Sequence, residues 1–478
     1  MSGWLVEEVH PVPAVMAAVR AFRDVPRLML FDSARRQQDQ GRYSFLTADP
    51  DFALSWQHAE YGCDPFQALP ALPTPAVSPS AWAGLPPFRG GWAGLLSYEL
   101  AACWERLPRA AHDEFQLPVW SVGWYSWVLA WDHEQQRAWF IGWDSLQRSA
   151  RERYRELIQR LQQLSAAEHT EAPLPRRSWS WSVQRTRARE DLVAVPVTWP
   201  ETAQQVFSNV STEEYLQGVA RVIEYIRAGD IFQANFTQRL LWPWSGDVVE
   251  LYARLRQQNP APHAGLLWTD DWAVLSASPE QFLRVQHDEV MTRPIKGTRR
   301  RCSLAEADLF TRDELRDSVK DAAENVMIVD LLRNDLSRVC RAGSVWVPRL
   351  CAVETLATVQ HLVSEVRGRL REGCTAWDVL RAAFPGGSIT GAPKIRAMHI
   401  LAELEPTVRG PYTGSLFYLS CDGALDSNIL IRTLVAREGW LQCGVGGGVT
   451  VRSVPHEEYQ ESWHKAAGLL RPLLDESV

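Results

Sequence analysis

Apolar and polar positions alternate over short stretches in the first third of the chain, which is the pattern of half-buried strands. Three apolar runs bounded by polar turn residues predict strands there, at 28–31, 119–131 and 138–143. Residues 149–164 instead repeat apolar positions at helical spacing. The stretch 166–206 is polar, charged and proline-bearing, which indicates a linker or a surface excursion. The pattern therefore divides the chain into regions 1–165 and 207–475 joined by that linker.

The second region mixes helical and strand-like stretches. Helices are predicted at 212–228, 313–336, 376–384, 394–404 and 457–474. Strands are predicted at 231–241, 266–268, 272–275, 281–285, 345–347, 363–366, 416–419, 428–435 and 440–445. The long helix 313–336 is expected to bury one apolar face, made of Val319, Ala322, Ala323, Val326, Met327 and Leu331.

Composition narrows the class of protein. The 478 residues are 46% hydrophobic and 22% charged, which is ordinary for a globular chain long enough for two domains. A net charge of −7 provides no basic field for nucleic acid. No apolar run approaches the length of a membrane span, and the first residues do not resemble a secretion signal. Eight cysteines without metal-ligand spacing favour reduced thiols, so we expect a cytoplasmic protein.

One lysine stands out in T-R-P-I-K-G-T-R-R-R, the stretch 292–301. The chain has 50 lysines and arginines together, yet only four are lysines, at 296, 320, 394 and 465. Arginine keeps its proton, whereas lysine can lose it and become a nucleophile. Neighbouring Arg293, Arg299 and Arg300 are expected to lower the pKa of Lys296, and Gly297 permits a turn beside it. The alternative is a surface lysine in a basic loop.

Acidic residues on the last predicted helix could hold a metal ion. Glu458, Glu461 and Lys465 share one helix face, and Glu324 on an earlier helix could add a third carboxylate. Mg²⁺ takes one or two carboxylates and keeps water or substrate oxygens. The alternative is a surface Glu–Lys pair worth about 0.2–0.5 kcal/mol.

Several other positions could bind an anion or move a proton. The run Gly444–Gly448 follows a predicted strand, where its bare N–H groups could cradle a carboxylate or simply form a tight turn. Arg432 ends an apolar strand and could pair with a carboxylate of a ligand or of the protein. Glu280 could be a general acid if it is buried, and His361 could contact a ligand or only pack. No cysteine lies in a glutaminase-like G-x-C-x-G setting.

Together these motifs resemble the chorismate-utilising enzyme family, which includes anthranilate, aminodeoxychorismate, isochorismate and salicylate synthases. The matching stretches are A-G-D-I-F-Q-A-N (228–235), S-A-S-P-E-Q-F (276–282), R-P-I-K-G-T-R-R (293–300), A-E-N-V-M-I-V-D-L-L-R-N-D (323–335), F-P-G-G-S-I-T-G-A-P-K (384–394), R-G-P-Y-T-G (409–414), D-S-N-I-L-I-R-T (426–433) and E-E-Y-Q-E-S-W-H-K (457–465). L-F-D-S-A (30–34) and G-R-Y-S-F-L (41–46) also look like the amino-terminal region of anthranilate synthase component I. The resemblance implies an α+β fold: two large antiparallel β-sheets packed as a sandwich with helices on the outside.

The resemblance also implies a branch of the family. Anthranilate synthases carry P-I-A-G-T where this chain has P-I-K-G-T, the form of aminodeoxychorismate synthase component I. The isochorismate-type enzymes use a lysine base to activate water, and the matching Gln233 cannot abstract a proton. The expected reaction therefore converts chorismate and ammonia to 4-amino-4-deoxychorismate, on the way to p-aminobenzoate and folate. Ammonia would come from a separate glutaminase subunit.

Site roles follow from the same resemblance. Lys296 would be the covalent nucleophile and Glu280 the acid that protonates the departing hydroxyl. Mg²⁺ would be held by Glu324 and Glu461, with Glu458 close or bridging through water. The substrate would be bound by Arg432, Lys465, Gly446, Gly448, Thr298, Gly297, His361, Tyr412 and Ser388.

Two further expectations concern regulation and alternatives. Family members can hold tryptophan between the sheets, and Ser33 lies at the matching place, although His263 stands where tryptophan-inhibited members usually have an aromatic residue.

The first alternative is an anthranilate synthase component that carries lysine. The second is a non-catalytic regulatory homologue, which would have no need of the complete set Glu280, Lys296, Glu324, Glu461 and Lys465.

Overall fold

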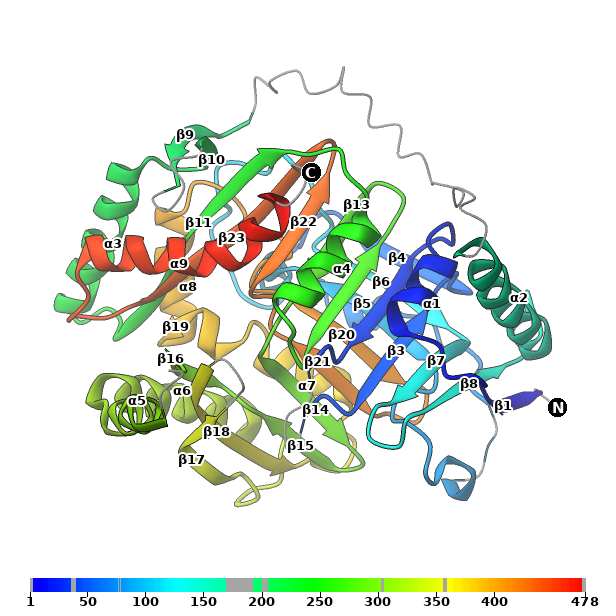
Figure 1. Ribbon diagram of the computed structural model, residues 1–478. Helices are drawn as coiled ribbons and strands as arrows, with labels where there is room; N and C mark the ends of the chain where they lie inside the picture. Colours follow the sequence, from blue (N-terminus) through cyan, green and yellow to red (C-terminus); the bar gives the residue numbers. More distant parts are fainter. Residues whose placement is uncertain are drawn as a thin grey trace.

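Two large antiparallel sheets form the protein, as the sequence predicts (Figure 1). The computed structural model describes residues 3–35, 40–75, 77, 79–168, 192–199, 205–301, 305–355 and 359–474. Within these residues one sheet has 13 strands and the other has 10.

The larger sheet runs in the order β1-β8-β7-β3-β2-β12-β13-β22-β23-β11-β10-β9, with β19 pairing beside β11. Its strands are β1 (Trp4–Glu8), β2 (Leu28–Asp32), β3 (Tyr43–Thr47), β7 (Trp127–Asp132), β8 (Arg137–Trp143), β9 (Val195–Thr198), β10 (Gln205–Ser208), β11 (Gln233–Pro243), β12 (Ala264–Trp268), β13 (Trp272–Ser276), β19 (Gly391–Ala392), β22 (Thr433–Arg437) and β23 (Trp440–Val449).

The smaller sheet runs in the order β16-β18-β15-β14-β21-β20-β5-β6-β4, with β17 pairing beside β18. Its strands are β4 (Phe52–Trp56), β5 (Gly91–Leu96), β6 (Trp120–Tyr125), β14 (Gln281–Gln286), β15 (Glu289–Thr292), β16 (Ile295–Arg300), β17 (Trp346–Thr355), β18 (Val359–Arg369), β20 (Ser415–Ser420) and β21 (Leu425–Asn428).

The two sheets pack face to face through a shared apolar core. Met29 and Leu267 from the larger sheet lie in one buried cluster with Leu95 and Leu416 from the smaller sheet. Aromatic rings also join them, since the rings of Phe45 and Tyr418 lie 5.4 Å apart. Burial of these inner faces is the main favourable contribution to the sandwich, at roughly 25 cal/mol for each Å² of apolar surface.

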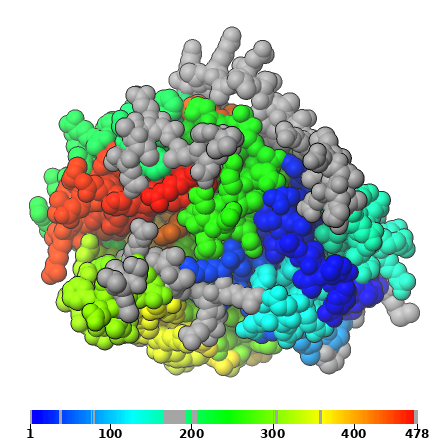
Figure 2. Space-filling model, in the orientation of Figure 1, coloured from blue at the N-terminus to red at the C-terminus, as the bar shows by residue number. Residues whose placement is uncertain are grey.

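Helices cover the outer faces of both sheets. The larger sheet is covered by α1 (Val15–Ala21), α2 (Ala150–Glu168), α3 (Thr212–Arg227), α4 (Val248–Gln258), α8 (Lys394–Leu404) and α9 (Pro455–Leu474). The smaller sheet is covered by α6 (Val319–Ser337) and α7 (Ala376–Ala383), with α5 (Ala305–Asp317) beside β16. In the space-filling view α9 (red) crosses the face above the α5–α6 region (yellow-green) (Figure 2).

Both regions of the chain contribute strands to both sheets. Strand β2 pairs with β12, where Asp32 opposes Ala264, and β5 pairs with β20, where Leu96 opposes Ser415. The predicted linker 166–206 includes β9 and the start of β10, while its residues 169–191 and 200–204 lie outside the described part of the chain. The division into regions therefore stays a prediction from sequence.

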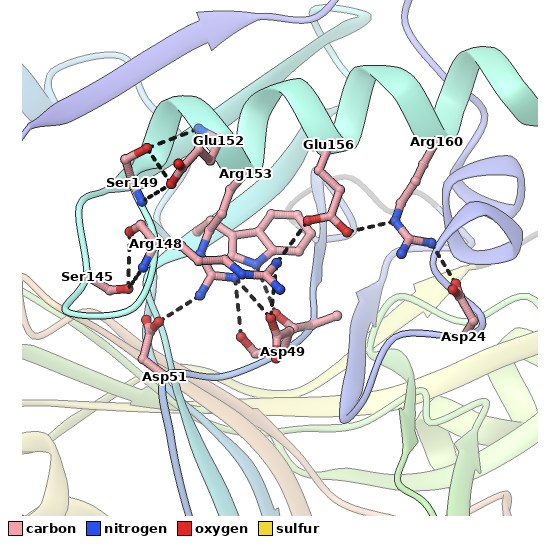
Figure 3. A network of polar contacts seen from close by, with 12 residues as sticks. Asp24, Asp49, Asp51, Ser145, Arg148, Ser149, Glu152, Arg153, Glu156 and Arg160 are labelled. Atoms are coloured by element: carbon pink, nitrogen blue, oxygen red, sulfur yellow. Dashed lines mark hydrogen bonds and ion pairs between the residues drawn. The ribbon is translucent and has the colours of Figure 1, made fainter.

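Helix α2 is attached to the first region by arginine–carboxylate pairs (Figure 3). The buried Arg153 side chain donates to Asp51 Oδ1 at 2.7 Å. Arg160 bridges Glu156 on its own helix, at 2.9 Å, and Asp24, at 2.6 Å. The buried charge of Arg153 is compensated by Asp51 and by Asp49, whose Oδ2 lies 3.6 Å from Arg153 Nη1, so the helix is held to this region by two carboxylates.

Two predicted elements are divided in the structure. The stretch 119–131 forms β6 and β7, which lie in different sheets, and the chain crosses between the sheets at Ser126. Every position of both strands is buried, so the sequence shows no polar break. The helix predicted at 313–336 is interrupted at Ser318, whose side chain accepts from Asp321 N and starts a new helix.

The predicted buried face of α6 was wrong. Val319 is 72% exposed and Val326 46% exposed. The buried face instead combines apolar residues such as Ile328 with the polar Asn325 and Asp335, whose hydrogen bonds are satisfied inside the protein. Hydrophobicity alone selects the wrong side of a helix that buries paired polar groups.

Candidate active site

Lys296 lies on β16 at a β-bulge. The pairing with β18 shifts register between Lys296 and Thr298, and Gly297 has φ +72°, which a residue with a Cβ rarely adopts. A Cβ at Gly297 would also lie 2.9 Å from Leu315 Cδ1. The bulge aims the Lys296 amine at the Ser388 carbonyl oxygen, to which it donates at 2.8 Å.

Burial lowers the pKa of Lys296, although carboxylates at Glu280 and Glu324 oppose the shift. The predicted cause was wrong, because two of the neighbouring arginines are committed elsewhere. Arg293 pairs with Glu354, and Arg299 donates to Asp321 Oδ2 at 3.0 Å. The side chain of Arg300 lies outside the described part. The amine is therefore more readily neutral than an ordinary lysine because the surrounding protein removes part of the hydration of its charged form.

Glu280 lies between β13 and β14 and is 5% exposed. Burial raises the pKa of its carboxyl group, while a hydrogen bond from the Ser388 side chain and the charge of Lys296 partly oppose this rise. Its main chain is fixed by Ile429 N, which donates to Glu280 O at 3.1 Å. A carboxyl group with a raised pKa keeps its proton at higher pH and can act as a general acid.

The acidic residues predicted on the last helix face β23. Lys465 Nζ lies 2.7 Å from Glu461 Oε1 and donates to Gly446 O at 2.8 Å. Ser453 Oγ donates to Glu458 Oε1 at 2.6 Å. Burial and the nearby Glu461 charge raise the pKa of Glu458. Burial also disfavours ionisation of Glu461, but Lys465 outweighs it and the pKa of Glu461 is lowered.

Glu324 on α6 completes the acidic group. Burial raises the pKa of Glu324, and the negative charge of Glu458 adds to the rise, so these carboxylates lie close enough to repel. Its Oε1 atom is buried and has no hydrogen-bond partner among the described residues. A buried acceptor without a donor is costly unless a cation or ligand supplies one.

The oxygen ligands of these carboxylates, and the space beside them, suit a hard divalent cation. At Gly447 an added Cβ would lie 3.1 Å from Glu458 Oε2 and 3.7 Å from Glu461 Oε1, so the missing side chain leaves room beside both oxygens. Among the described residues no three His, Cys, Asp or Glu side chains form a ready-made metal site. The arrangement suits an ion such as Mg²⁺, which keeps water or substrate oxygens in its shell.

The glycine run 444–448 was predicted to follow a strand, but it forms part of β23 itself. It pairs with β11, and Gly446 opposes Thr237 while Gly448 opposes Asn235. Strand β22 accompanies β23 only as far as Gln442. Glycine is required at Gly446 because a Cβ there would lie 2.1 Å from the main-chain Phe236 O, and a Cβ at Gly448 would displace the Gln233 side chain, whose Nε2 would lie 2.0 Å away.

Arg432 lies close enough to His361 for its charge to act on the imidazole ring. Arg432 has φ +51° in the turn between β21 and β22, and its side chain has no hydrogen-bond or ion-pair partner among the described residues. Burial lowers the pKa of Arg432, although its side chain keeps exposed surface. His361 is buried on β18 opposite Thr298, and burial together with the charges of Arg432 and Arg35 lowers the pKa of His361 to about 4.

The structure also gives the positions of three further predicted residues. Ser388 is buried in the short 3-10 helix η5 (Gly387–Ile389), and Tyr412 is buried with its ring against Gly444. Thr298 lies on β16, and its side chain is outside the described part. Sequence reasoning missed Lys320, on the first turn of α6, whose charge acts on Glu324, Glu458 and Glu461. The rarity of lysine could have identified it.

Ser33 lines a separate cavity between the sheets. This cavity has a volume of about 360 Å³, and its walls also include His263, Arg284 and Tyr418. Ser33 Oγ donates to Tyr43 O at 2.6 Å. None of the lining residues belongs to the group around Lys296. Whether tryptophan occupies this cavity stays a prediction.

The described helices include none that is long and apolar enough to cross a membrane.

Comparison with known proteins gives closely related sequences. A family model described as chorismate binding enzyme matches residues 37–471. Aminodeoxychorismate synthase component 1 of Escherichia coli K12 is 37% identical over 461 residues, covering 94% of each chain. Anthranilate synthase component 1 of Thermus thermophilus is 40% identical over 387 residues, covering 81% of this chain and 78% of the relative.

Solved structures agree on the fold. Anthranilate synthase component I from Streptococcus pneumoniae TIGR4 superimposes with a TM-score of 0.70 at 28% identity, covering 91% of this chain and 93% of the other. The menaquinone-specific isochorismate synthase MenF from Escherichia coli gives a TM-score of 0.68 at 16% identity, covering 99% and 95%.

Proposed function

Because the chain belongs to the chorismate-binding enzyme family, we propose that it is the synthase that aminates chorismate to 4-amino-4-deoxychorismate. The observation that carries the proposal is the Lys296 amine, with its lowered pKa, held against Ser388 together with Glu280, whose pKa is raised. A lysine prepared in this way is a nucleophile, and the adjacent acid can protonate a leaving group.

The reaction proceeds in two displacements. Neutral Lys296 Nζ bonds to ring carbon C2, and both ring double bonds shift by one position. The C4–oxygen bond breaks as Glu280 gives its proton to the departing hydroxyl, which leaves as water. Ammonia then bonds to C4, the double bonds shift back, and the C2–nitrogen bond breaks with its electron pair left on Lys296 Nζ. One ammonia is consumed and one water released, and Glu280 regains a proton from the ammonium first formed at C4.

Glu324 and Glu461 would hold Mg²⁺ directly, and Glu458 would lie close or bind through water. When bound, the ion would neutralise a substrate carboxylate and stabilise charge that develops nearby. The buried Glu324 Oε1, unpartnered among the described residues, and the space beside Gly447 support this assignment.

Basic side chains and the main chain of the glycine run would position the substrate. Arg432 has no acidic partner among the described residues, so a substrate carboxylate is its proposed counter-ion. Lys465 would bind a second carboxylate together with the main chain at Gly446 and Gly448. The further proposed contacts are Gly297, Thr298, Ser388, Tyr412 and His361, the last as a neutral ring at neutral pH because its pKa is about 4.

Water should not be the nucleophile. Gln233 occupies the position at which the isochorismate-type enzymes have a lysine base, and an amide cannot abstract a proton. Gln233 is buried against Gly448 and its Oε1 has no partner among the described residues. We propose that it accepts a hydrogen bond from substrate or ammonia rather than activating water.

Ammonia is proposed to come from a separate glutaminase chain, since this sequence lacks the nucleophile motif of a glutaminase. A relative carries the printed name component 1, which supports a second component. The test is copurification of a glutaminase with the tagged chain, followed by a comparison of rates with glutamine and with ammonium salts.

Incubation with chorismate, ammonium and Mg²⁺, followed by mass spectrometry of the product, tests the activity itself. We expect 4-amino-4-deoxychorismate, without release of pyruvate. Formation of isochorismate, or no reaction, would overturn the proposal.

Anthranilate formation is the second candidate. It is favoured by the 40% identity to the Thermus thermophilus anthranilate synthase component, which exceeds the 37% identity to the Escherichia coli aminodeoxychorismate relative. The same incubation separates the two, because anthranilate is fluorescent and is formed with release of pyruvate. A fluorescent product without aminodeoxychorismate would reverse the choice.

A further inference from the structure

Lys394 is the one described lysine whose ammonium is buried in a salt bridge. It is 9% exposed, and its Nζ lies 2.6 Å from Asp335 Oδ2, an atom of α6, and donates to Ala383 O at 2.8 Å. The other three lysines, at 296, 320 and 465, all act electrostatically on Glu461 or Glu324. A compact ammonium suits this position because it can donate to two oxygens within a small space.

The contacts of Lys394 join the two ends of a short segment of chain. Ala383 is the last residue of α7 and Lys394 is the first of α8, so the ammonium links the start and the end of the segment 384–393. Asp335 lies on α6, so its contact with Lys394 attaches the segment to that helix. Glu324 lies eleven positions before Asp335 on the same helix, or about three helical turns. The segment is thereby fixed to the helix that carries a proposed metal ligand.

The opposite side of the segment is attached to β11 of the large sheet and to Arg409, which lies between α8 and β20. Asn235 N donates to Thr390 O at 2.8 Å, and Arg409 Nη1 donates to Ile389 O at 3.1 Å. Between these attachments lies Ser388, whose carbonyl accepts from Lys296 Nζ and whose side chain hydrogen-bonds to Glu280. The segment therefore holds the proposed nucleophile and the proposed acid in one place.

We propose that the Lys394–Asp335 pair is a positioning device for the reaction, which sets the Ser388 carbonyl where it orients the Lys296 amine. The proposal rests on the proposed role of Lys296 as the nucleophile. Neither Lys394 nor Asp335 touches the substrate, and both act through the segment between them. Loosening the segment displaces the amine and admits water beside it.

The test replaces the pair with apolar residues, as Lys394→Met with Asp335→Leu. Apolar replacement of a buried ion pair is often neutral for stability, whereas removal of one partner leaves an unpaired charge. Arg396→Gln is the matched control, because Arg396 lies on α8 with Lys394 and the change breaks only a partly exposed ion pair with Asp230. If the double variant does not fold, Lys394→Gln is the second variant, since it keeps a donor toward Ala383 O.

Two readouts separate positioning from stability. We expect kcat for amination to fall about 100-fold, the scale of a misplaced reacting group, while KM for chorismate stays near that of the native chain. Competitive amine labelling followed by peptide mass spectrometry gives the titration midpoint of Lys296, with a free lysine derivative added as the reference. The Lys296 midpoint should rise toward the ordinary value of about 10.4 in the variant and stay unchanged in the control.

A folded variant with native kcat, or with an unchanged Lys296 midpoint, would overturn the positioning role. Labelling needs no chorismate, so it judges this proposal separately from the proposed function. If the native chain makes no aminated product, the function fails. An upward shift of the midpoint in the variant would still establish the structural link between Lys394 and Lys296.

Discussion

Replacing Lys296 by arginine should nearly abolish amination while preserving the positive charge. The Lys296 amine is a nucleophile only when neutral, and burial lowers its pKa. Arginine has a pKa of about 12.5–13.8, against about 10.4 for an unperturbed lysine. The neutral fraction at a given pH therefore falls by about 100-fold to 2,500-fold from this difference alone. The burial of Lys296 widens the gap further.

This loss corresponds to about 2.7–4.6 kcal/mol in the activation free energy. Geometry adds to it, because the amine fits within 2.8 Å of Ser388 O and a planar guanidinium is larger. The assay follows product by chromatography and mass spectrometry at saturating chorismate, ammonium and Mg²⁺. Intact-protein mass spectrometry of the quenched native enzyme should also detect chorismate, less one water, attached to the chain.

Arg299→Lys is the matched control, since it exchanges the same two residue types three positions along β16, in a partly exposed pair with Asp321. It should leave turnover close to native. Near-native turnover in Lys296→Arg, or a covalent adduct that persists in Lys296→Met, would refute the covalent step. A shift of the product to anthranilate in Lys296→Ala would show that position 296 selects the branch of the family.

Three further outcomes are expected. Glu461→Gln should raise the Mg²⁺ concentration needed for half-maximal rate by at least roughly tenfold, and an unchanged titration would remove this residue from the metal site. Gly447→Ala should fold but bind Mg²⁺ more weakly in calorimetry, because its methyl group would lie 3.1 Å from Glu458 Oε2. Gly446→Ala should be insoluble or strongly destabilised, because its methyl group would lie 2.1 Å from a main-chain oxygen. Equal behaviour of the two variants would contradict the strand register. Burial lowers the pKa of His263 to about 3 in the folded chain, against about 6.5 in the unfolded chain. Between these values only the unfolded chain gains the proton, so the free energy of unfolding falls as pH decreases. His263→Asn should remove this loss of stability. In urea titrations, the free energy of unfolding of the native chain should fall by about 2 kcal/mol more than that of the variant between about pH 7.5 and pH 5. The same fall in both proteins would exclude a contribution from His263.

The sequence predicted the fold and most members of the candidate site, because these depend on motif chemistry and local periodicity. Helix α8 has the predicted bounds 394–404, and the hairpin β12–β13 lies where its turn residues indicate. The permissive backbone of Gly297 predicted a turn beside Lys296, whereas the structure has a β-bulge within β16 at this place.

Features that depend on long-range packing could not be predicted in the same way. The run 444–448 resembles a turn because it is all glycine and valine, and only the neighbouring β11 backbone explains why side chains are excluded there. The lowered pKa of Lys296 comes from burial by distant segments rather than from adjacent arginines. Asp335 is buried because of Lys394, which lies 59 positions away.

Helix α9 has a consequence for how the protein becomes active as it is made. It follows every described strand and carries Glu458, Glu461 and Lys465, so the proposed metal and carboxylate contacts reach their places only after both sheets have been synthesised. Strand β2 pairs early with β3 but must wait for β12, more than 200 positions later, to acquire its second partner. A nascent chain stalled before α9 would expose the glycine face of β23 and would have no means of binding chorismate in the proposed way.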